Sequence, residues 1–366
     1  MAAMVESLAG CLTRQGHRIS VAGMGAEPHV GDTPLGVYSG GLKNRSMIIR
    51  GAFELAGSLR LASLLRGCIR KGRLPVPQLV VVFLPSLFLA LTSGLLKRLY
   101  GCQVFLVQRD LLPDWLIQSG RLRPGVASWL LGRLKVLALA DADQVGIECE
   151  ENRRFIPTRF QSKVEVVVNW RDYSPAQTYL NPLPEEFTLV YGGRIGFAQG
   201  FDRFLDALIT AKLPDVRFQI YCDERGASEL TAMRKEFSHQ VAGIAVHSML
   251  PEAMFLAKAS MCSMGVVSLS PEMGTHNIPG KLLGYLAAGI PVFAIGPDGC
   301  ALGRLVEDLG IGIFADANQK GTIAAKLTRV ASDRKLVSKL KENALTARPK
   351  FSVENAAAQI QSFVQV

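Results

Sequence analysis

Two positively charged residues follow glycine-containing turns where an expected strand gives way to an expected helix. In the segment GTHNIPGKLLGYLAAGIPV, Lys281 opens an apolar run that has the pattern of a buried helix closed by Gly289. In YGGRIGFAQG, Arg194 lies between an expected strand, Phe187–Tyr191, and a helix that begins near Phe201. The first turn of a helix presents free backbone N–H groups, and a cation there adds its charge to a site for anions. The two turns therefore predict a diphosphate site, the alternative being that both cations are ordinary surface charges.

The elements that would position these turns alternate between strands and helices along the whole chain. From Phe187 to Val267 short apolar runs alternate with helical patterns, which predicts a parallel, doubly wound sheet. In the first half, Leu79–Leu96 is eighteen residues without a charge, but Pro85 and Ser86 divide it into a strand and a helix. We expect that strand and helix rather than a membrane span, with shallow membrane insertion of Leu87–Leu99 as a further possibility.

Four motifs in a fixed order resemble those of the family 4 glycosyltransferases. They are RDLLP at 109–113, VNWRD at 168–172, GGRIGFAQG at 192–200 and IPGKLLGYLAAGIPV at 278–292. They are most similar to the subgroup of bacterial O-antigen, capsule and colanic-acid pathways, which is fucosaminyltransferase-like. The resemblance implies a B-type fold of two Rossmann-like domains that face each other across a cleft. It also implies retaining transfer of a sugar from a nucleotide-diphosphate sugar, with a UDP-sugar as the expected donor.

The resemblance also suggests residues for the site. Those expected to bind the donor are Gly193, Arg194, Gly196, Gln199, Ile278, Pro279, Lys281 and Leu282. Further possible site residues are Arg109, Glu272 and His276. Asp110, which follows the expected strand Cys102–Val107, is the catalytic candidate: it could orient or deprotonate an acceptor hydroxyl, or hold Arg109. The alternative for Asp110 is a helix N-cap.

Two departures from the family pattern suggest a different function. The carboxylates that the wider family has at two positions are replaced by His276 and Gly284. Two hydrogen bonds to a carboxylate contribute roughly 3 kcal/mol, so donor binding or activity would be reduced. The alternative function is therefore a degenerate, non-catalytic family member that binds a partner or scaffolds polysaccharide assembly. A sugar-nucleotide epimerase on the same fold is a weaker alternative, because no matching acid and base are recognisable.

The second departure concerns the start of the chain. The family has a strand and a glycine-rich loop before its first helix, here Met4–Gln15, and neither is recognisable. We therefore expect a first domain that lacks its first strand, and a native product with additional residues before Met1.

Length and composition indicate two domains. A chain of 366 residues exceeds one ordinary core, and Tyr173–Phe187, rich in proline, is the expected linker. We expect an acceptor-binding domain over 1–178, a donor-binding domain over 179–345 and, by resemblance, a C-terminal segment over 346–366 that packs back on the first domain.

The charge of the chain indicates an anionic partner. The formal net charge is +10, whereas aromatic residues make up only 7% and are not interleaved with the basic ones, so we expect no nucleic acid. The helical pattern Ala52–Arg70 carries several arginines and is either a core-facing helix with a solvated face or a helix on an anionic membrane surface.

The expected partners follow from these observations. They are a nucleotide-sugar donor, a polyprenyl-diphosphate-linked saccharide acceptor and an anionic membrane surface. Seven scattered cysteines and five scattered histidines suggest neither a disulfide framework nor a metal site, and we expect no cofactor. The expected location is the cytoplasm, peripheral to the inner face of a bacterial plasma membrane.

Overall fold

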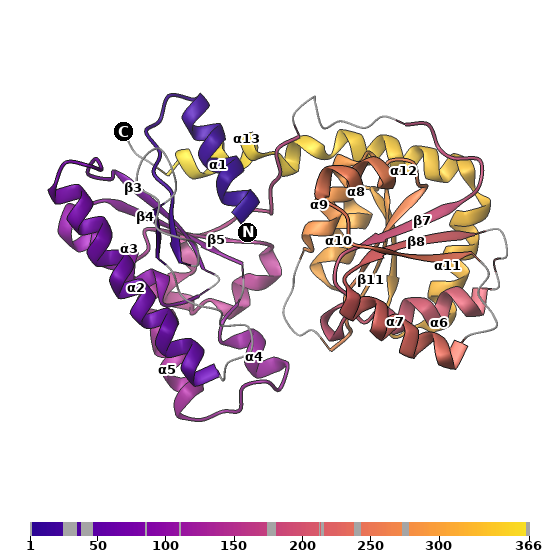
Figure 1. Ribbon diagram of the computed structural model, residues 1–366, viewed down its shortest axis with the longest axis horizontal. Coiled ribbons are helices and arrows are strands. Elements are labelled where there is room, and N and C mark those ends of the chain that lie inside the picture. Colours follow the sequence, from indigo (N-terminus) through magenta and orange to yellow (C-terminus); the bar gives the residue numbers. More distant parts are fainter. Residues whose placement is uncertain are drawn as a thin grey trace. The chain divides into compact units, whose positions relative to one another are not determined.

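A computed structural model shows the chain as two compact units, each built on parallel strands (Figure 1). The first unit comprises Met1–Val168 with Val353–Val366, and the second Asn169–Ser352. The expected domain boundary at 178–179 lies inside the second unit. The structure describes residues 2–24, 35–37, 47–84, 86–109, 111–173, 181–211, 213, 216–237, 243–272 and 278–363.

The first unit has a four-stranded parallel sheet. Its strand order is β3 (Leu79–Phe83), β4 (Gln103–Gln108), β5 (Gln144–Ile147) and β6 (Val164–Val166). Two further strands, β1 (Ala22–Met24) and β2 (Leu35–Val37), pair with each other in parallel. The helices are α1 (Ala2–Arg14), α2 (Met47–Arg70), α3 (Leu89–Tyr100), α4 (Asp114–Gln118), α5 (Val126–Asp141) and α13 (Val353–Gln361), with short 3-10 helices at Glu150–Phe155 and Thr158–Lys163.

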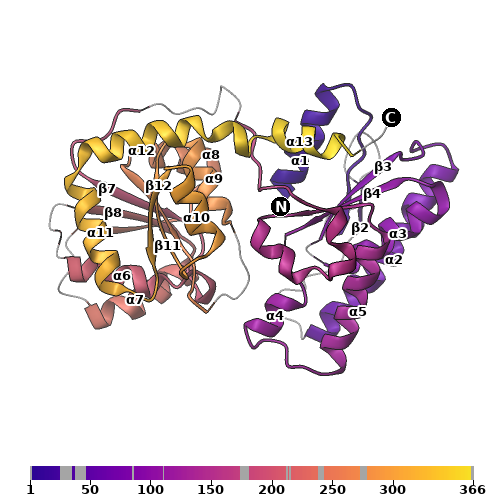
Figure 2. The ribbon, with the colours of Figure 1, turned by 180° about the vertical axis from the view of Figure 1, so that it is seen from behind.

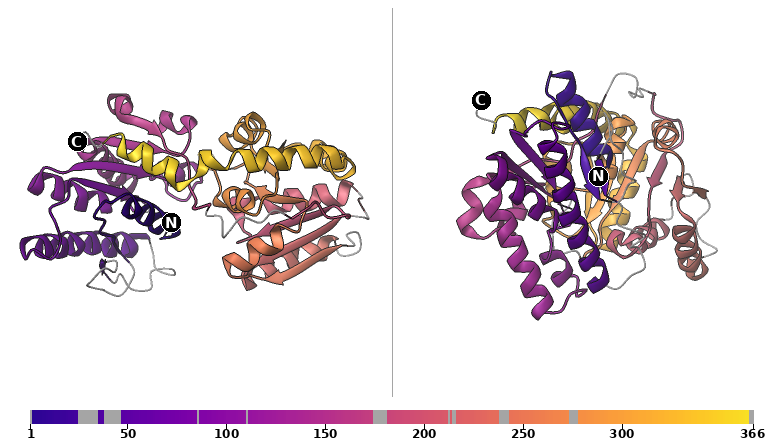
Figure 3. Two further views of the ribbon diagram at one scale, coloured as in Figure 1. Left: turned by 90° about the horizontal axis from the view of Figure 1, so that it is seen from above. Right: turned by 60° about the vertical axis from the view of Figure 1, so that its left-hand side comes forward.

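The last helix of the chain belongs to this first unit. Helix α13 packs against α1, and the two lie side by side in Figure 1, Figure 2 and Figure 3. The side chain of Gln361 donates to Gln15 Oε1 at 2.9 Å, so the two ends of the described chain are joined by a polar contact as well.

Helix α3 is packed inside the unit, between α2 and α5. Leu87 and Ala90 are buried in one cluster with strand residues such as Leu106, and Leu96 is buried as well. Three apolar side chains of Leu87–Leu99 are therefore already enclosed by protein, which argues against insertion of this segment into a membrane. Among the residues that the structure describes, no helix is long and apolar enough to span a bilayer.

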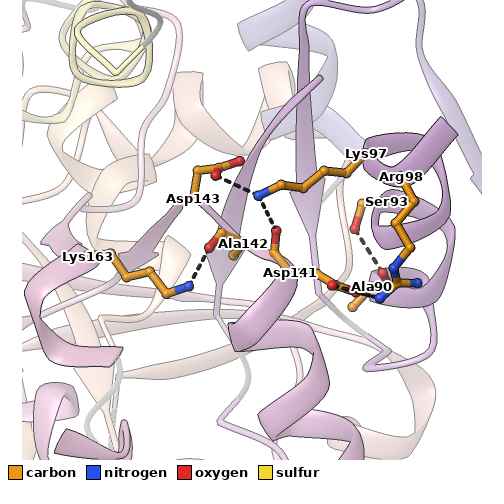
Figure 4. A network of polar contacts seen from close by, with 8 residues as sticks. All are labelled: Ala90, Ser93, Lys97, Arg98, Asp141, Ala142, Asp143 and Lys163. Carbon is orange, nitrogen blue, oxygen red and sulfur yellow. Dashed lines mark hydrogen bonds and ion pairs between the residues drawn. The ribbon is translucent and has the colours of Figure 1, made fainter. Parts of the chain in front are cut away.

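A network of polar contacts fixes the C-terminal end of α5 (Figure 4). Lys97 donates to the carbonyl of Asp141 at 2.9 Å and to the carboxylate of Asp143 at 2.6 Å, and Lys163 bonds the carbonyl of Ala142. Arg98 binds both carboxylate oxygens of Asp141 at 2.8 Å. Lysines at a helix C-terminus satisfy carbonyls that lack a partner within the helix, so this network ties α3, α5 and the start of β5 together.

The second unit has a six-stranded, all-parallel sheet. Its strand order is β12 (Gly312–Asp316), β11 (Val292–Gly296), β10 (Met264–Ser268), β7 (Thr188–Gly192), β8 (Arg217–Cys222) and β9 (Ile244–Ser248). Its helices are α6 (Phe201–Ala211), α7 (Glu224–Phe237), α8 (Glu252–Ala259), α9 (Gly280–Ala287), α10 (Ala301–Asp308), α11 (Lys320–Ser332) and α12 (Arg334–Thr346), and 3-10 turns lie at Phe197–Gln199 and Arg348–Phe351. The predicted α/β class with parallel sheets in two domains is confirmed.

The two faces of this sheet are packed differently. On one face, Phe204 and Phe218 belong to a cluster that also includes residues of α11 and α12. On the other face, two strand positions are glycines. A Cβ at Gly265 would lie 2.3 Å from the ring of Tyr285, and one at Gly192 would lie 2.3 Å from the ring of Phe255. Because neither strand residue has a side chain there, α8 and α9 bring aromatic rings directly onto the backbone of the sheet.

Candidate functional site

The candidate site lies at the point where the strand order of the second sheet reverses. From β7 the chain proceeds to β8 and β9 on one side, and then returns to place β10 on the other side of β7. In parallel α/β sheets ligands bind outside the carboxyl ends of the two strands that flank such a reversal. The loops after β7 and β10 carry the two motifs that predict a diphosphate site, so the topology brings both to one edge.

The loop after β7 begins with a residue that only glycine adopts easily. Gly193 has a φ of +125° and donates its N–H to the carbonyl of Tyr221 at 2.9 Å. The hydroxyl of Tyr191 donates to the carbonyl of Arg194 at 2.5 Å, and the Arg194 side chain is exposed. Gln199 donates its backbone N–H to the carbonyl of Gly196 at 3.0 Å. The turn is thus held by its own backbone, while the Arg194 side chain extends into solvent.

The loop after β10 is bound to the loop after β7. The Ser268 hydroxyl donates to the carbonyl of Gln199 at 2.6 Å, and the N–H of Ser270 donates to the carbonyl of Ala198 at 3.0 Å. Gly200 has a φ of +52°, and a Cβ there would lie 2.8 Å from Ser270 Cα. The two loops therefore approach at backbone contact.

Helix α9 is fixed at three points. The buried Tyr285 accepts from the N–H of Gly192 and donates to the carbonyl of Val266, both at 3.2 Å. Asn169 donates its side-chain amide to the carbonyl of Ile278 at 2.8 Å, just before the helix begins. Arg348 donates to the last carbonyls of the helix, those of Leu286 at 2.7 Å and Ala287 at 3.0 Å. The position of the helix N-terminus relative to β7 is set by these contacts.

Lys281 is the residue of this site with the most unusual surroundings. Its ammonium lies 4.8 Å from the ring centroid of Tyr191, and a Cβ at Gly193 would lie 2.8 Å from its Cε. Burial lowers the pKa of Lys281 to about 8. No hydrogen bond or ion pair to its ammonium occurs within the described ranges of the chain. A half-buried cation at the first turn of a helix, without a carboxylate, is electrostatically suited to an anion.

Other residues predicted at the donor site form the core or bind their own loop in the structure. Ile278 and Leu282 are buried, and the N–H of Leu282 donates to the carbonyl of Pro279 at 2.9 Å, so the first helical turn is closed by packing. Glu272 is exposed and accepts from the buried Ser270 hydroxyl, which holds the pKa of Glu272 below its ordinary value. The carboxylate of Glu272 is thus turned back toward its own loop.

The candidate residues of the first domain are described within their own unit. Arg109 lies in the first unit, where its guanidinium donates to the carbonyls of Val167 at 3.0 Å and Val168 at 3.4 Å. Burial lowers the pKa of Arg109 to about 10, partly offset by the charge of Glu148. The predicted residues Asp110 and His276 lie outside the described residues.

Sequence reasoning missed the residues that support the site. The sequence motifs predict no role for Tyr191, Tyr285 and Arg348. They include Asn169 only as part of VNWRD. The aromatic residues follow an apolar pattern that is also typical of core, and Arg348 is separated from α9 by about sixty residues. Within the described ranges, no group of three or more His, Cys, Asp or Glu side chains could hold a metal ion.

Gly284 occupies the position where the family has its second carboxylate. It is buried, and a Cβ there would meet only Leu256 Cδ2, at 3.9 Å. A small side chain would therefore fit, so packing alone does not require glycine at this position.

Comparison with known proteins supports this fold. No protein-family model matches the chain. A probable glycosyltransferase of Pseudomonas aeruginosa, WbjE, is 23% identical over 258 residues. The match covers 67% of this chain and 64% of the relative, so the chain spans less than two thirds of that relative's length.

Solved structures share the fold of the chain. Sucrose-phosphate synthase from Thermosynechococcus elongatus superposes with a TM-score of 0.72 at 14% identity, over 98% of this chain and 91% of the other. HepE of Anabaena, solved in complex with UDP-glucose, gives 0.65 at 13% identity, over 94% and 99%. The chain shares the two-domain α/β fold of these structures.

Proposed function

We propose that the chain is a glycosyltransferase that transfers a sugar from a UDP-sugar to a lipid-linked saccharide in cell-surface polysaccharide synthesis. In this proposal it has the B-type fold and acts with retention, as its resemblance to the family 4 enzymes suggests. The observation that supports the donor half is the ammonium of Lys281 at the N-terminus of α9, beside the strand-order reversal, which has no hydrogen-bond or ion-pair partner among the residues that the structure describes.

The chemistry of the donor explains why such a cation is useful. When the sugar leaves, negative charge develops on the nucleoside diphosphate, and preformed donors and cations stabilise that charge in the transition state. Lys281 supplies the charge, and the exposed Arg194 can supply a second cation at the edge of the loop after β7. The structure of HepE with UDP-glucose gives an example of this fold with such a donor.

The acceptor half of the proposal has separate support. The net charge of +10 favours anionic partners, among them a polyprenyl diphosphate and an anionic membrane surface. Asp110 is the proposed group that orients or deprotonates the acceptor hydroxyl, as its place after β4 and its resemblance to the RDLWP motif of the subgroup suggest.

The test is donor binding followed by turnover. Calorimetry should find that UDP binds more tightly than inorganic phosphate, and that Lys281→Met weakens UDP binding by about ten- to a hundredfold, as expected for a charge-assisted hydrogen bond of roughly 1.5–3 kcal/mol. Lys258→Met, which removes an exposed lysine from α8 in the same unit, is the matched control and should bind UDP normally. Equal UDP affinity for Lys281→Met and wild type would refute the placement of the diphosphate.

Gly284 favours one rival, a family member that binds a nucleotide without transferring sugar. In the family this position carries a carboxylate that would hold the ribose of the donor. Gly284 has no side chain that could replace it. Screening UDP-, GDP- and TDP-sugars for hydrolysis separates the two functions, because a binder retains UDP affinity but shows no turnover with any donor.

A further inference from the structure

Helix α5 of the first unit is apolar on the side that faces solvent as well as on the side that faces the sheet. Ala138 and Leu139 are buried against the sheet, whereas Val126, Trp129 and Leu130 are 75%, 63% and 55% exposed. Leu137, at 51% exposed, continues the same outward side, and Ile117 of α4 adds a further apolar side chain, 37% exposed. A helix that is apolar all round is normally enclosed by protein or lipid. We call these five residues, Ile117, Val126, Trp129, Leu130 and Leu137, the α5 face.

The charged side chains in the stretch that carries the α5 face have one sign. From Trp115 to Ala140 the chain contains no Asp or Glu. Arg121, Arg123 and Arg133 are exposed in this stretch, and the Arg121 guanidinium lies 5.3 Å from the ring centroid of Trp115. Basic residues around exposed Trp and Leu side chains are the composition of a segment that lies on an anionic lipid surface.

Helix α2 shows the same combination on the other side of α3. Phe53 and Leu59 are 45% and 55% exposed, and Arg66 and Arg70 are exposed farther along. Both α2 and α5 lead, through short connections, into the start of a strand of the same parallel sheet, so their N-terminal ends lie at the same end of the unit (Figure 1 and Figure 3). That end is the carboxyl edge of the sheet, where α/β domains bind ligands.

We propose that the α5 face docks on an anionic lipid bilayer, with Trp129 and Leu130 in the interface and Arg121, Arg123 and Arg133 against the headgroups. This inference rests on the lipid-linked acceptor of the proposed function and places the contact with the membrane on the α5 face instead of on Leu87–Leu99. It places the carboxyl edge of the first sheet, which includes the end of β4, at the surface where a lipid-linked acceptor is held.

The charge pattern favours a bilayer over a second copy of this chain. In a symmetric dimer through the α5 face, the same three arginines of each copy would approach one another with no carboxylate in the stretch to offset them. An anionic bilayer instead supplies the opposite charge over a broad surface, and each arginine near it strengthens binding about fivefold.

The test is binding to vesicles, with full-length protein. Vesicles of phosphatidylglycerol mixed with phosphatidylcholine should bind the protein, whereas pure phosphatidylcholine vesicles should bind it much more weakly, and added salt should reduce the difference. Trp129→Ser with Leu130→Ser should weaken binding at least about tenfold, since two large apolar side chains no longer enter the interface. Arg123→Gln with Arg133→Gln should also weaken binding, by about tenfold or more, and should flatten its dependence on salt.

Matched controls on the second unit identify the surface. Met254→Ser with Met261→Ser removes two side chains that are 55% and 61% exposed, and Lys335→Gln with Lys339→Gln removes two exposed charges. Both should bind vesicles like wild type. Because all these positions are exposed, every variant should keep the thermal unfolding and the UDP affinity of wild type, so a failure of membrane docking is separable from a failure of donor binding.

Tryptophan fluorescence locates the contact directly. The chain has three Trp residues, and Trp170 is buried. The emission should shift to the blue on anionic vesicles, and Trp129→Phe should remove most of that shift while the protein still binds. Vesicle binding that is unchanged in the Trp129→Ser, Leu130→Ser variant would overturn the proposal. So would sedimentation that shows a dimer in wild type and a monomer in that variant, since the face would then join two copies of the chain.

Discussion

Replacing Lys281 by methionine should stabilise the unliganded protein while it weakens nucleotide binding. Burial lowers the pKa of Lys281 from its ordinary value of 10.5 to about 8, which corresponds to about 3 kcal/mol of unfavourable free energy for the charged form. The contact of the ammonium with the ring of Tyr191 offsets about 0.5–2 kcal/mol of this. Methionine has nearly the same shape without the charge. Lys281→Met should therefore raise the unfolding free energy of the second unit by about 1–3 kcal/mol at neutral pH.

The gain in unfolding free energy from Lys281→Met should decrease as the pH rises. Below pH 8 Lys281 is protonated in both the folded and the unfolded chain, so the full cost of the buried charge is present. Between about pH 8 and 10.5 the folded chain releases a proton that the unfolded chain retains, and the stability of wild type rises relative to the variant. Above pH 10.5 the lysine is neutral in both states, and the advantage of methionine should disappear.

The protonation of Lys281 should also be visible in nucleotide binding. A diphosphate beside Lys281 favours the charged amine, so UDP binding near pH 8 to 9 should take up a fraction of a proton. Calorimetry in buffers of different ionisation enthalpy measures this uptake, which Lys281→Met should abolish.

Hydrogen exchange measures the stability of the second unit by itself. Core peptides from β7 and β10 should exchange more slowly in Lys281→Met than in wild type at pH 7. Lys258→Met, in which an exposed lysine changes, should show no such effect. A variant that is less stable than wild type at pH 7, or a stability difference that does not change up to pH 10.5, would refute the assignment of Lys281 as a cation desolvated by burial.

Three further substitutions test the packing that positions the site. Gly193→Ala should cost about 1–3 kcal/mol of stability, because its φ is +125° and the new Cβ would meet Lys281, and calorimetry should show weaker UDP binding. Tyr285→Phe should cost about 1–3 kcal/mol by leaving buried backbone groups without a partner, visible as a lower midpoint of thermal unfolding. Gly94→Ala should destabilise only the first unit, since its Cβ would lie 2.1 Å from the Asp141 carboxylate, and UDP affinity should stay unchanged.

The regular elements could be predicted from local patterns. The expected strand Phe187–Tyr191 is found at Thr188–Gly192, and the helical pattern Ala52–Arg70 lies within α2, Met47–Arg70. Continuous apolar runs and glycine stops contain this information within one segment. The order of the strands, which defines the candidate site, comes from pairings between segments far apart in the sequence.

Burial could not be predicted from the same patterns. Helices α3 and α5 are both rich in Leu, yet Ala90 and Leu96 of α3 are buried whereas Trp129 and Leu130 of α5 are exposed. Apolar composition is the same in a helix that faces protein and in one that faces lipid. Only the arrangement of α2, α3 and α5 on one unit decides which of them is free to meet a membrane.

The same limit applies to the proposed phosphate site, and it has a consequence for the proposed function. The sequence places a lysine at a helix start, but its burial arises because Tyr285 brings α9 onto the glycine positions of β7 and β10, and because Asn169 and Arg348 hold the two ends of the helix. By fixing α9 on the sheet, these contacts keep water away from the Lys281 ammonium in the free protein, before any nucleotide binds. A diphosphate that binds then meets a cation already stripped of part of its water, and the interaction is stronger than at an exposed lysine. The pKa of Lys281 near 8 is thus the expected mark of a preorganised anion site.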